Sequence, residues 1–97
     1  MEIEWSPLAT ERVIEIAGKI ALDKPDVAME WASRIFDSAE KLREHPRLGR
    51  IVPEIQEEDY RELIEGNYRI IYLVSASKIS VLTVRHGKQL LSAEELK

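Results

Sequence analysis

Arginines recur beside tyrosines in two apolar runs of the chain, and a third apolar run ends in a basic cluster. The runs are Tyr60-Arg61-Glu62-Leu63-Ile64, Tyr68-Arg69-Ile70-Ile71-Tyr72 and Val84-Arg85-His86-Gly87-Lys88. Strand side chains alternate between the two faces of a sheet, so each arginine would point away from its apolar neighbours. Guanidinium groups gathered on one face could bind phosphates or carboxylates. The pattern predicts a cationic binding strip, and the candidates for it are Arg61, Arg69, Arg85, His86 and Lys88.

The elements that carry these residues are three short strands, expected at residues 60–65, 68–74 and 79–84. The polar turns between them, Gly66-Asn67 and residues 75–78, are typical of an antiparallel meander. In a regular third strand Arg85 and His86 point to opposite faces, so only one of them joins the strip unless the strand bulges. The alternation favours Arg85, in phase with Val81 and Thr83, on condition that this face is not the core.

The first half of the chain predicts one strand and a helical hairpin. Residues 2–5 alternate polar and apolar side chains, and Ser6-Pro7 supplies an N-cap followed by a proline at the first helical position. Apolar residues then recur at helical spacing over residues 7–21, and again after Asp23-Lys24-Pro25-Asp26, which offers capping chemistry. His45-Pro46 ends the second helix, and residues 47–59 form a loop or weakly extended segment. The order β-α-α-β-β-β predicts an α+β fold, an antiparallel sheet with a helical hairpin on one face.

The composition is that of a folded, acidic domain. The 97 residues have a formal net charge of −4 and no cysteine. That charge argues against broad binding to nucleic acids, whose affinity comes from basic residues, although Arg43, Arg47 and Arg50 could form a local basic patch. The lack of cysteine excludes thiolate chemistry, and two isolated histidines do not make a metal site. We expect one domain over residues 1–97, with neither metal nor cofactor.

The sequence also bears on the location of the protein. The start of the chain has neither the basic nor the apolar segment of a signal peptide, and no apolar run approaches the length of a membrane span. We therefore expect a soluble protein of the cytoplasm with no membrane partner.

Five short motifs, in order, resemble the ParE branch of the RelE/ParE toxin superfamily of plasmid stabilisation proteins. The resemblance runs from about Ile3 to Lys88, and its motifs are Trp5-Ser6-Pro7, Pro46-Arg47-Leu48-Gly49-Arg50, Tyr60-Arg61-Glu62-Leu63, Tyr68-Arg69-Ile70-Ile71-Tyr72 and Val84-Arg85-His86-Gly87. It implies the toxin half of a toxin–antitoxin module. Within the superfamily, RelE-type members cut messenger RNA in the ribosome, whereas ParE-type members act against DNA gyrase.

The residues favour the ParE branch. The resemblance matches Arg69 to a catalytic arginine of RelE-type enzymes and places Arg61 where a lysine is usual, but Leu63 and Gln89 replace two further cations. Cleavage of RNA without a metal needs groups that activate the 2′-hydroxyl, stabilise the phosphate and assist the leaving oxygen. We therefore expect no catalytic residues, and a toxin that inhibits DNA gyrase and is neutralised by a cognate antitoxin.

Two alternatives from other classes stay open. The first is a ribosome-dependent endoribonuclease that uses Arg61, Arg69, Arg85 and His86, with the ribosome and messenger RNA as partners. The second is an inactivated toxin that serves only to bind its antitoxin. Each candidate residue also has a plain structural interpretation: Arg69 would be an exposed sheet arginine that pairs with Glu62 or Glu65, acidic neighbours would occupy Arg61, and His86 would be a hydrogen-bonded group at a strand end.

Overall fold

A five-stranded sheet with two helices on one face makes up the part of the chain that the structure, a computed structural model, describes: residues 1–87 and 89–96. The strand order across the sheet is β1-β5-β4-β3-β2. The elements are β1 (Glu2–Trp5), α1 (Pro7–Ala21), α2 (Pro25–Glu40), the 3-10 turn η1 (Lys41–Arg43), β2 (Arg50–Ile51), β3 (Tyr60–Glu65), β4 (Tyr68–Val74), β5 (Lys78–His86) and the 3-10 turn η2 (Ala93–Leu96).

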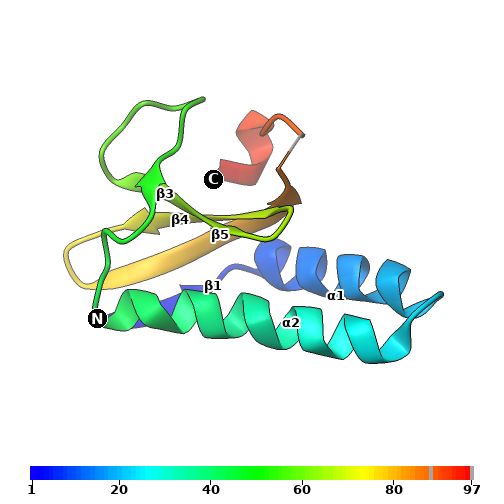
Figure 1. Cartoon of the computed structure of the whole chain (residues 1–97). Helices are drawn as coiled ribbons and strands as arrows, with labels where there is room; N and C mark the ends of the chain where they lie inside the picture. The colour runs from blue at the N-terminus through cyan, green and yellow to red at the C-terminus, as the bar shows by residue number, and fades with distance from the viewer. Residues whose placement is uncertain (88, 97) are drawn as a thin grey trace.

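The two faces of the sheet are covered differently. Figure 1 shows α1 and α2 side by side against one face, while the loop before β3 and the C-terminal turn η2 lie over the other, which we call the open face. The predicted α+β class and helical hairpin are confirmed. Neither helix in residues 1–87 and 89–96 has the length and apolar character needed to cross a membrane.

The sheet differs from the expected meander at its two edges. β1 runs parallel to β5, so the sheet is mixed and only its other pairings are antiparallel. Arg50, expected in a loop, and Ile51, expected in an irregular or weakly extended segment, form β2 and pair with Glu62 and Arg61. A two-residue strand is too short to show alternation in the sequence. Its backbone is held by β3 residues that lie ten and twelve positions further along the chain.

The predicted N-terminal cap is present in α1 but not in α2. Ser6 caps α1 as predicted: its Oγ accepts a hydrogen bond from the Ala9 amide at 3.0 Å and donates one to the Leu82 carbonyl at 2.9 Å. The cap therefore also ties α1 to β5. At α2 the prediction of side-chain capping was wrong, because the N-cap residue is Lys24, which makes no capping hydrogen bond, and Pro25 opens the helix.

The core fills the space between the hairpin and the sheet. Its main cluster joins Ala9, Val13, Trp31 and Ile35 of the helices to Ile70, Val81 and Val84 of the central strands. A second cluster comprises Leu42, Tyr72, Val74 and Ile79. Burial of an aliphatic or aromatic side chain contributes roughly 1.5–3 kcal/mol, so these clusters hold the helices to one face of the sheet.

A bulge in β5 changes which residues share a face. Ile71 pairs with Thr83 and Tyr72 with Val81, so Leu82 is an extra residue opposite the Ile71–Tyr72 step. Val81 and Thr83 consequently face opposite sides of the sheet, and the expectation that both are in phase with Arg85 was wrong. Thr83 and Arg85 lie on the open face, whereas Val81 is part of the core.

Gly49 allows a close approach between the segment before β2 and the sheet. Its amide donates to the Tyr72 hydroxyl at 2.9 Å, and a Cβ at this position would lie 2.4 Å from the Glu62 carbonyl oxygen. We predict that Gly49→Ala lowers the free energy of unfolding by about 1–3 kcal/mol, because a strand carbonyl cannot move aside as a flexible side chain can. Chemical denaturation measures this change. Gly18→Ala is the matched control, since nothing lies within 4 Å of a Cβ added there; equal losses in both variants would contradict the prediction.

Candidate functional site

Arg69, the arginine at the centre of the sheet, is buried on the open face between two carboxylates. Only 5% of the residue is exposed. Its Nε and Nη2 donate to Glu62 Oε1 at 2.8 and 2.6 Å. Its Nη1 and Nη2 each donate to one oxygen of Glu54 at 2.7 Å. The Arg69 guanidinium and the Glu54 carboxylate thus form a bidentate pair of hydrogen bonds.

Glu62 extends these contacts into a chain of four charges, Glu54–Arg69–Glu62–Arg50, which we call the ion-pair network. The Glu62 side chain is fully buried, and its Oε2 accepts from Arg50 Nε at 2.6 Å. Hydrogen bonding to Arg69 lowers the pKa of Glu54 to about 2. Hydrogen bonding to Glu54 and then to Glu62 raises the pKa of Arg69 above its usual value, against the effect of burial. A buried charge is tolerated when each member has its counterpart, as here.

The expectation of an exposed Arg69 was therefore wrong, although Glu62 was one of its two expected partners. Glu65, the other, lies on the helix face, where its Oε1 accepts from Ser38 Oγ at 2.6 Å. Glu54 replaces it, from a loop that the sequence did not connect with β4.

Arg85 is the direct cross-strand neighbour of Arg69 on the open face. It forms an ion pair with Glu95 of η2, and Glu95 is only 3% exposed. Thr83 Oγ1 donates to the same carboxylate at 3.0 Å, and Ser92 Oγ donates to it at 3.1 Å. Like charges directly opposite each other destabilise a sheet, so carboxylates from outside the strands offset the repulsion and hold the C-terminal turn on the open face.

The other predicted site residues do not join Arg69 and Arg85. Arg61 pairs with Tyr72 across the strands and so points to the helix face, where it donates to the carbonyls of Glu58 at 2.9 Å and Gly49 at 3.0 Å. These acceptors are backbone carbonyls, not the acidic side chains expected for it. His86 also lies on the helix face, with its ring 5.5 Å from that of Tyr68. Lys88 lies outside the described residues.

Arg43, Arg47 and Arg50, which could have formed a local basic patch, each have an acidic partner instead. Arg43 lies 2.6 Å from Glu40, Arg47 lies 2.8 Å from Asp59, and Arg50 binds Glu62. The pairs of Arg43 and Arg47 are exposed and contribute about 0–1 kcal/mol each, whereas the Arg50–Glu62 contact belongs to the ion-pair network. All three contacts remove the uncompensated positive charge that a phosphate-binding surface would need.

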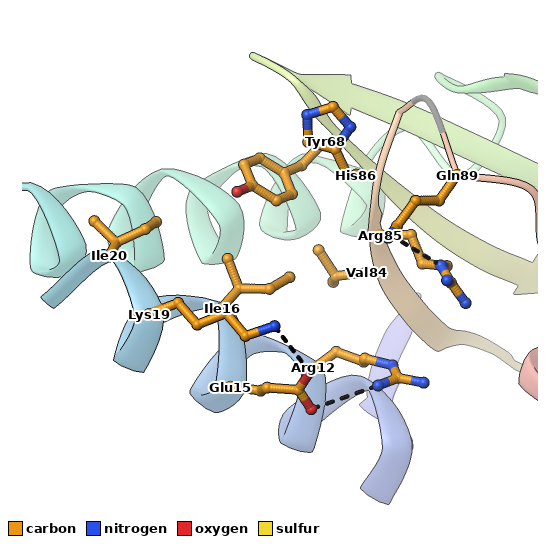
Figure 2. A pocket seen from close by; sticks show the side chains of 10 residues that line it. All are labelled: Arg12, Glu15, Ile16, Lys19, Ile20, Tyr68, Val84, Arg85, His86 and Gln89. Atoms are coloured by element: carbon orange, nitrogen blue, oxygen red, sulfur yellow. Dashed lines mark hydrogen bonds and ion pairs between the residues drawn. The ribbon is translucent and has the colours of Figure 1, made fainter. Parts of the chain in front are cut away.

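A cavity of about 230 Å³ lies between α1 and the ends of β4 and β5 (Figure 2). Arg12 and Lys19 line it from α1, opposite Tyr68 and Arg85 from the sheet. Sequence reasoning missed this site, since it followed only the apolar stripe of the first helix. The available signal was the seven-residue interval between Arg12 and Lys19, which places two cations beside that stripe.

The helical hairpin on a sheet with a meander of three long strands is the fold of the ParE, RelE and YoeB toxins, and comparisons with known proteins agree. A family model described as the ParE toxin of the type II toxin–antitoxin system parDE matches residues 3–91, and the chain belongs to this family. The toxin candidate Y4kP of Sinorhizobium fredii (strain NBRC 101917 / NGR234) is 35% identical over 92 residues, which span 90% of this chain and 88% of that protein.

Solved structures show the same fold. The chromosomal ParDE toxin–antitoxin system from P. aeruginosa matches with a TM-score of 0.75 at 18% identity, over 89% of this chain and 95% of that one. The YoeB/ParE toxin from Agrobacterium tumefaciens matches with a TM-score of 0.61 at 16% identity, over 89% and 98% of the two chains. The RelBE2 toxin–antitoxin complex from Mycobacterium tuberculosis matches with 0.54 at 18% identity, over 88% and 95%.

The ion-pair network predicts a specific acid sensitivity. The pKa of Glu54 is lowered from 4.5 to about 2, so its contribution to stability is complete above 4.5 and is lost as the pH falls from there to about 2. The loss from this group amounts to at most about 3 kcal/mol. Glu54→Gln should flatten the fall of the unfolding free energy in this interval, as measured by urea denaturation.

The matched control for this prediction is Glu30→Gln, which removes an exposed carboxylate of α2 outside the network. It should keep the acid sensitivity of the wild type. An equally steep loss of stability in Glu54→Gln would show that the Glu54–Arg69 contact does not contribute.

Proposed function

We propose that this type II toxin inhibits DNA gyrase and that a cognate antitoxin neutralises it. The observation that carries the proposal is the state of Arg69, whose side chain is 6% exposed and bound by two carboxylates. A guanidinium in this state cannot contact the phosphate of an incoming messenger RNA. Arg69 acts here as the centre of a structural network.

Two further positions support the same conclusion. Leu63 packs against the core on the helix face, so it offers no charge to an RNA substrate on the open face. Gln89 is neutral, and its backbone carbonyl accepts from Arg69 Nη1 at 3.3 Å. With Arg85 paired to Glu95 and Arg50 to Glu62, each described arginine near Arg69 on the open face is held by a carboxylate.

An antitoxin partner is supported by the neighbours and by the surface of the hairpin. The P. aeruginosa and M. tuberculosis structures are named as a toxin–antitoxin system and complex. In this chain, large apolar side chains of the helical hairpin remain exposed, namely Ile14, Leu22, Val27, Met29 and Phe36. A partner segment that folds on binding could cover exposed apolar side chains of this kind.

Assays with purified DNA gyrase and with induced cells test the proposed target. The protein should inhibit supercoiling of plasmid DNA, and its induction should cause filamentation with a DNA-damage response. Co-expression of the polypeptide encoded by a neighbouring short gene should restore growth. Rapid arrest of translation with cleaved messages would instead support the ribonuclease, and unimpaired growth would support an antitoxin-binding module without toxicity.

Glu54→Gln sharpens this test, because it removes one of the two carboxylates that occupy Arg69. We predict that gyrase inhibition per folded molecule stays within about twofold of wild type, since Arg69 has no part in it. If Arg69 were catalytic toward RNA, release of the guanidinium would increase message cleavage. Circular dichroism at neutral pH establishes the folded fraction of the variant before the comparison.

A further inference from the structure

The cavity between α1 and the sheet has an apolar half and a cationic half. Ile16, Ile20 and Val84 line the apolar half. Figure 2 shows the Arg12 and Arg85 guanidinium groups at one end of the cavity and the Lys19 ammonium directed toward Glu15. A ligand that fills this space therefore needs an apolar part beside an anionic part.

The cations at the rim retain unused hydrogen-bond donors. Arg12 Nε is buried and has no hydrogen-bond partner among the described residues, and Arg12 Nη1 reaches Glu15 only at 3.5 Å. Lys19 Nζ lies 3.7 Å from the same carboxylate and its side chain is 74% exposed. An arginine has five donors and a lysine three, so a second carboxylate could bind both cations while Glu15 stays in place.

The positive charge left at the cavity rim after pairing determines which anions the cavity can bind. Glu15 offsets part of the charge of Arg12 and Lys19, and Glu95 holds Arg85. The rim therefore suits a single carboxylate better than the repeated charges of a nucleic-acid backbone, whose binding depends on several unpaired basic residues. The aliphatic wall suits a side chain that gains by leaving water.

We propose that this cavity receives an acidic side chain and an adjacent apolar side chain of a partner polypeptide, and that this partner is the antitoxin. The proposal deepens the function proposed above and rests on its antitoxin clause. The carboxylate would accept charge-assisted hydrogen bonds from the exposed part of the Arg12 guanidinium and from Lys19 Nζ, and the apolar side chain would lie against Ile16, Ile20 and Val84.

A capped dipeptide tests the chemistry of the site on the full chain. In a nuclear magnetic resonance titration, N-acetyl-Leu-Glu-amide should shift the methyl signals of Ile16, Ile20 and Val84, and N-acetyl-Leu-Gln-amide should bind more weakly by about tenfold. The double variant Arg12→Gln/Lys19→Gln should abolish the difference between the two probes. Equal binding of both dipeptides to the wild type, or shifts caused by oligothymidylate and not by the dipeptides, would overturn the proposal.

Binding of the antitoxin itself gives the second test. Arg12→Gln/Lys19→Gln should raise the Kd for the co-expressed polypeptide by at least about tenfold and reduce the salt dependence of binding. Arg34→Gln is the matched control, because it removes an exposed cation of α2 that does not line the cavity. An unchanged Kd in the double variant, with its fold intact by thermal denaturation, would place the antitoxin elsewhere and overturn this inference alone. Failure of the wild type to bind any such polypeptide would overturn the antitoxin clause of the proposed function as well.

Discussion

The buried contact between Glu62 and Arg69 organises the open face of the sheet. Its carboxylate also binds Arg50 of β2, and its arginine also binds Glu54 of the following loop. One side-chain pair therefore joins two strands, the edge strand and a loop. Removal of one partner of a buried pair typically costs about 3–5 kcal/mol, because the other charge is left without compensation. The network thus holds β2, β3, β4 and the loop after β2 together on the open face.

The apolar clusters and the ion-pair network lie on opposite faces of the sheet. The hairpin and the sheet are held by the apolar clusters on the helix face. The chemistry of the open face depends on whether carboxylates occupy its arginines, as Glu54 and Glu95 do here. Because fold and site are separate, membership of the ParE toxin family leaves the target to be argued from the site.

The local elements could be predicted because their signals lie within a few residues of one another. Ser6-Pro7 predicts the start of α1. Gly66, which adopts a positive φ of 58°, lies in the turn between β3 and β4. The bulge at Leu82 could not be predicted, since it arises from the pairing of β5 with β4. It reversed the face expected for Val81 relative to Arg85.

The candidate site likewise has features that follow from the sequence and features that only the tertiary structure sets. The sequence by itself determined which residues are charged, which segments form strands and which face an arginine takes relative to its strand neighbours, because alternation is a local property of the backbone. The tertiary structure decided that Arg61 and Arg69 lie on opposite faces, and that Glu54, fifteen residues before Arg69, neutralises it. Strand register and loop closure bring such distant groups together. Once they are buried, each charged side chain destabilises the fold unless its partner compensates its charge. Those contacts turn the predicted cationic strip into a closed ion-pair network.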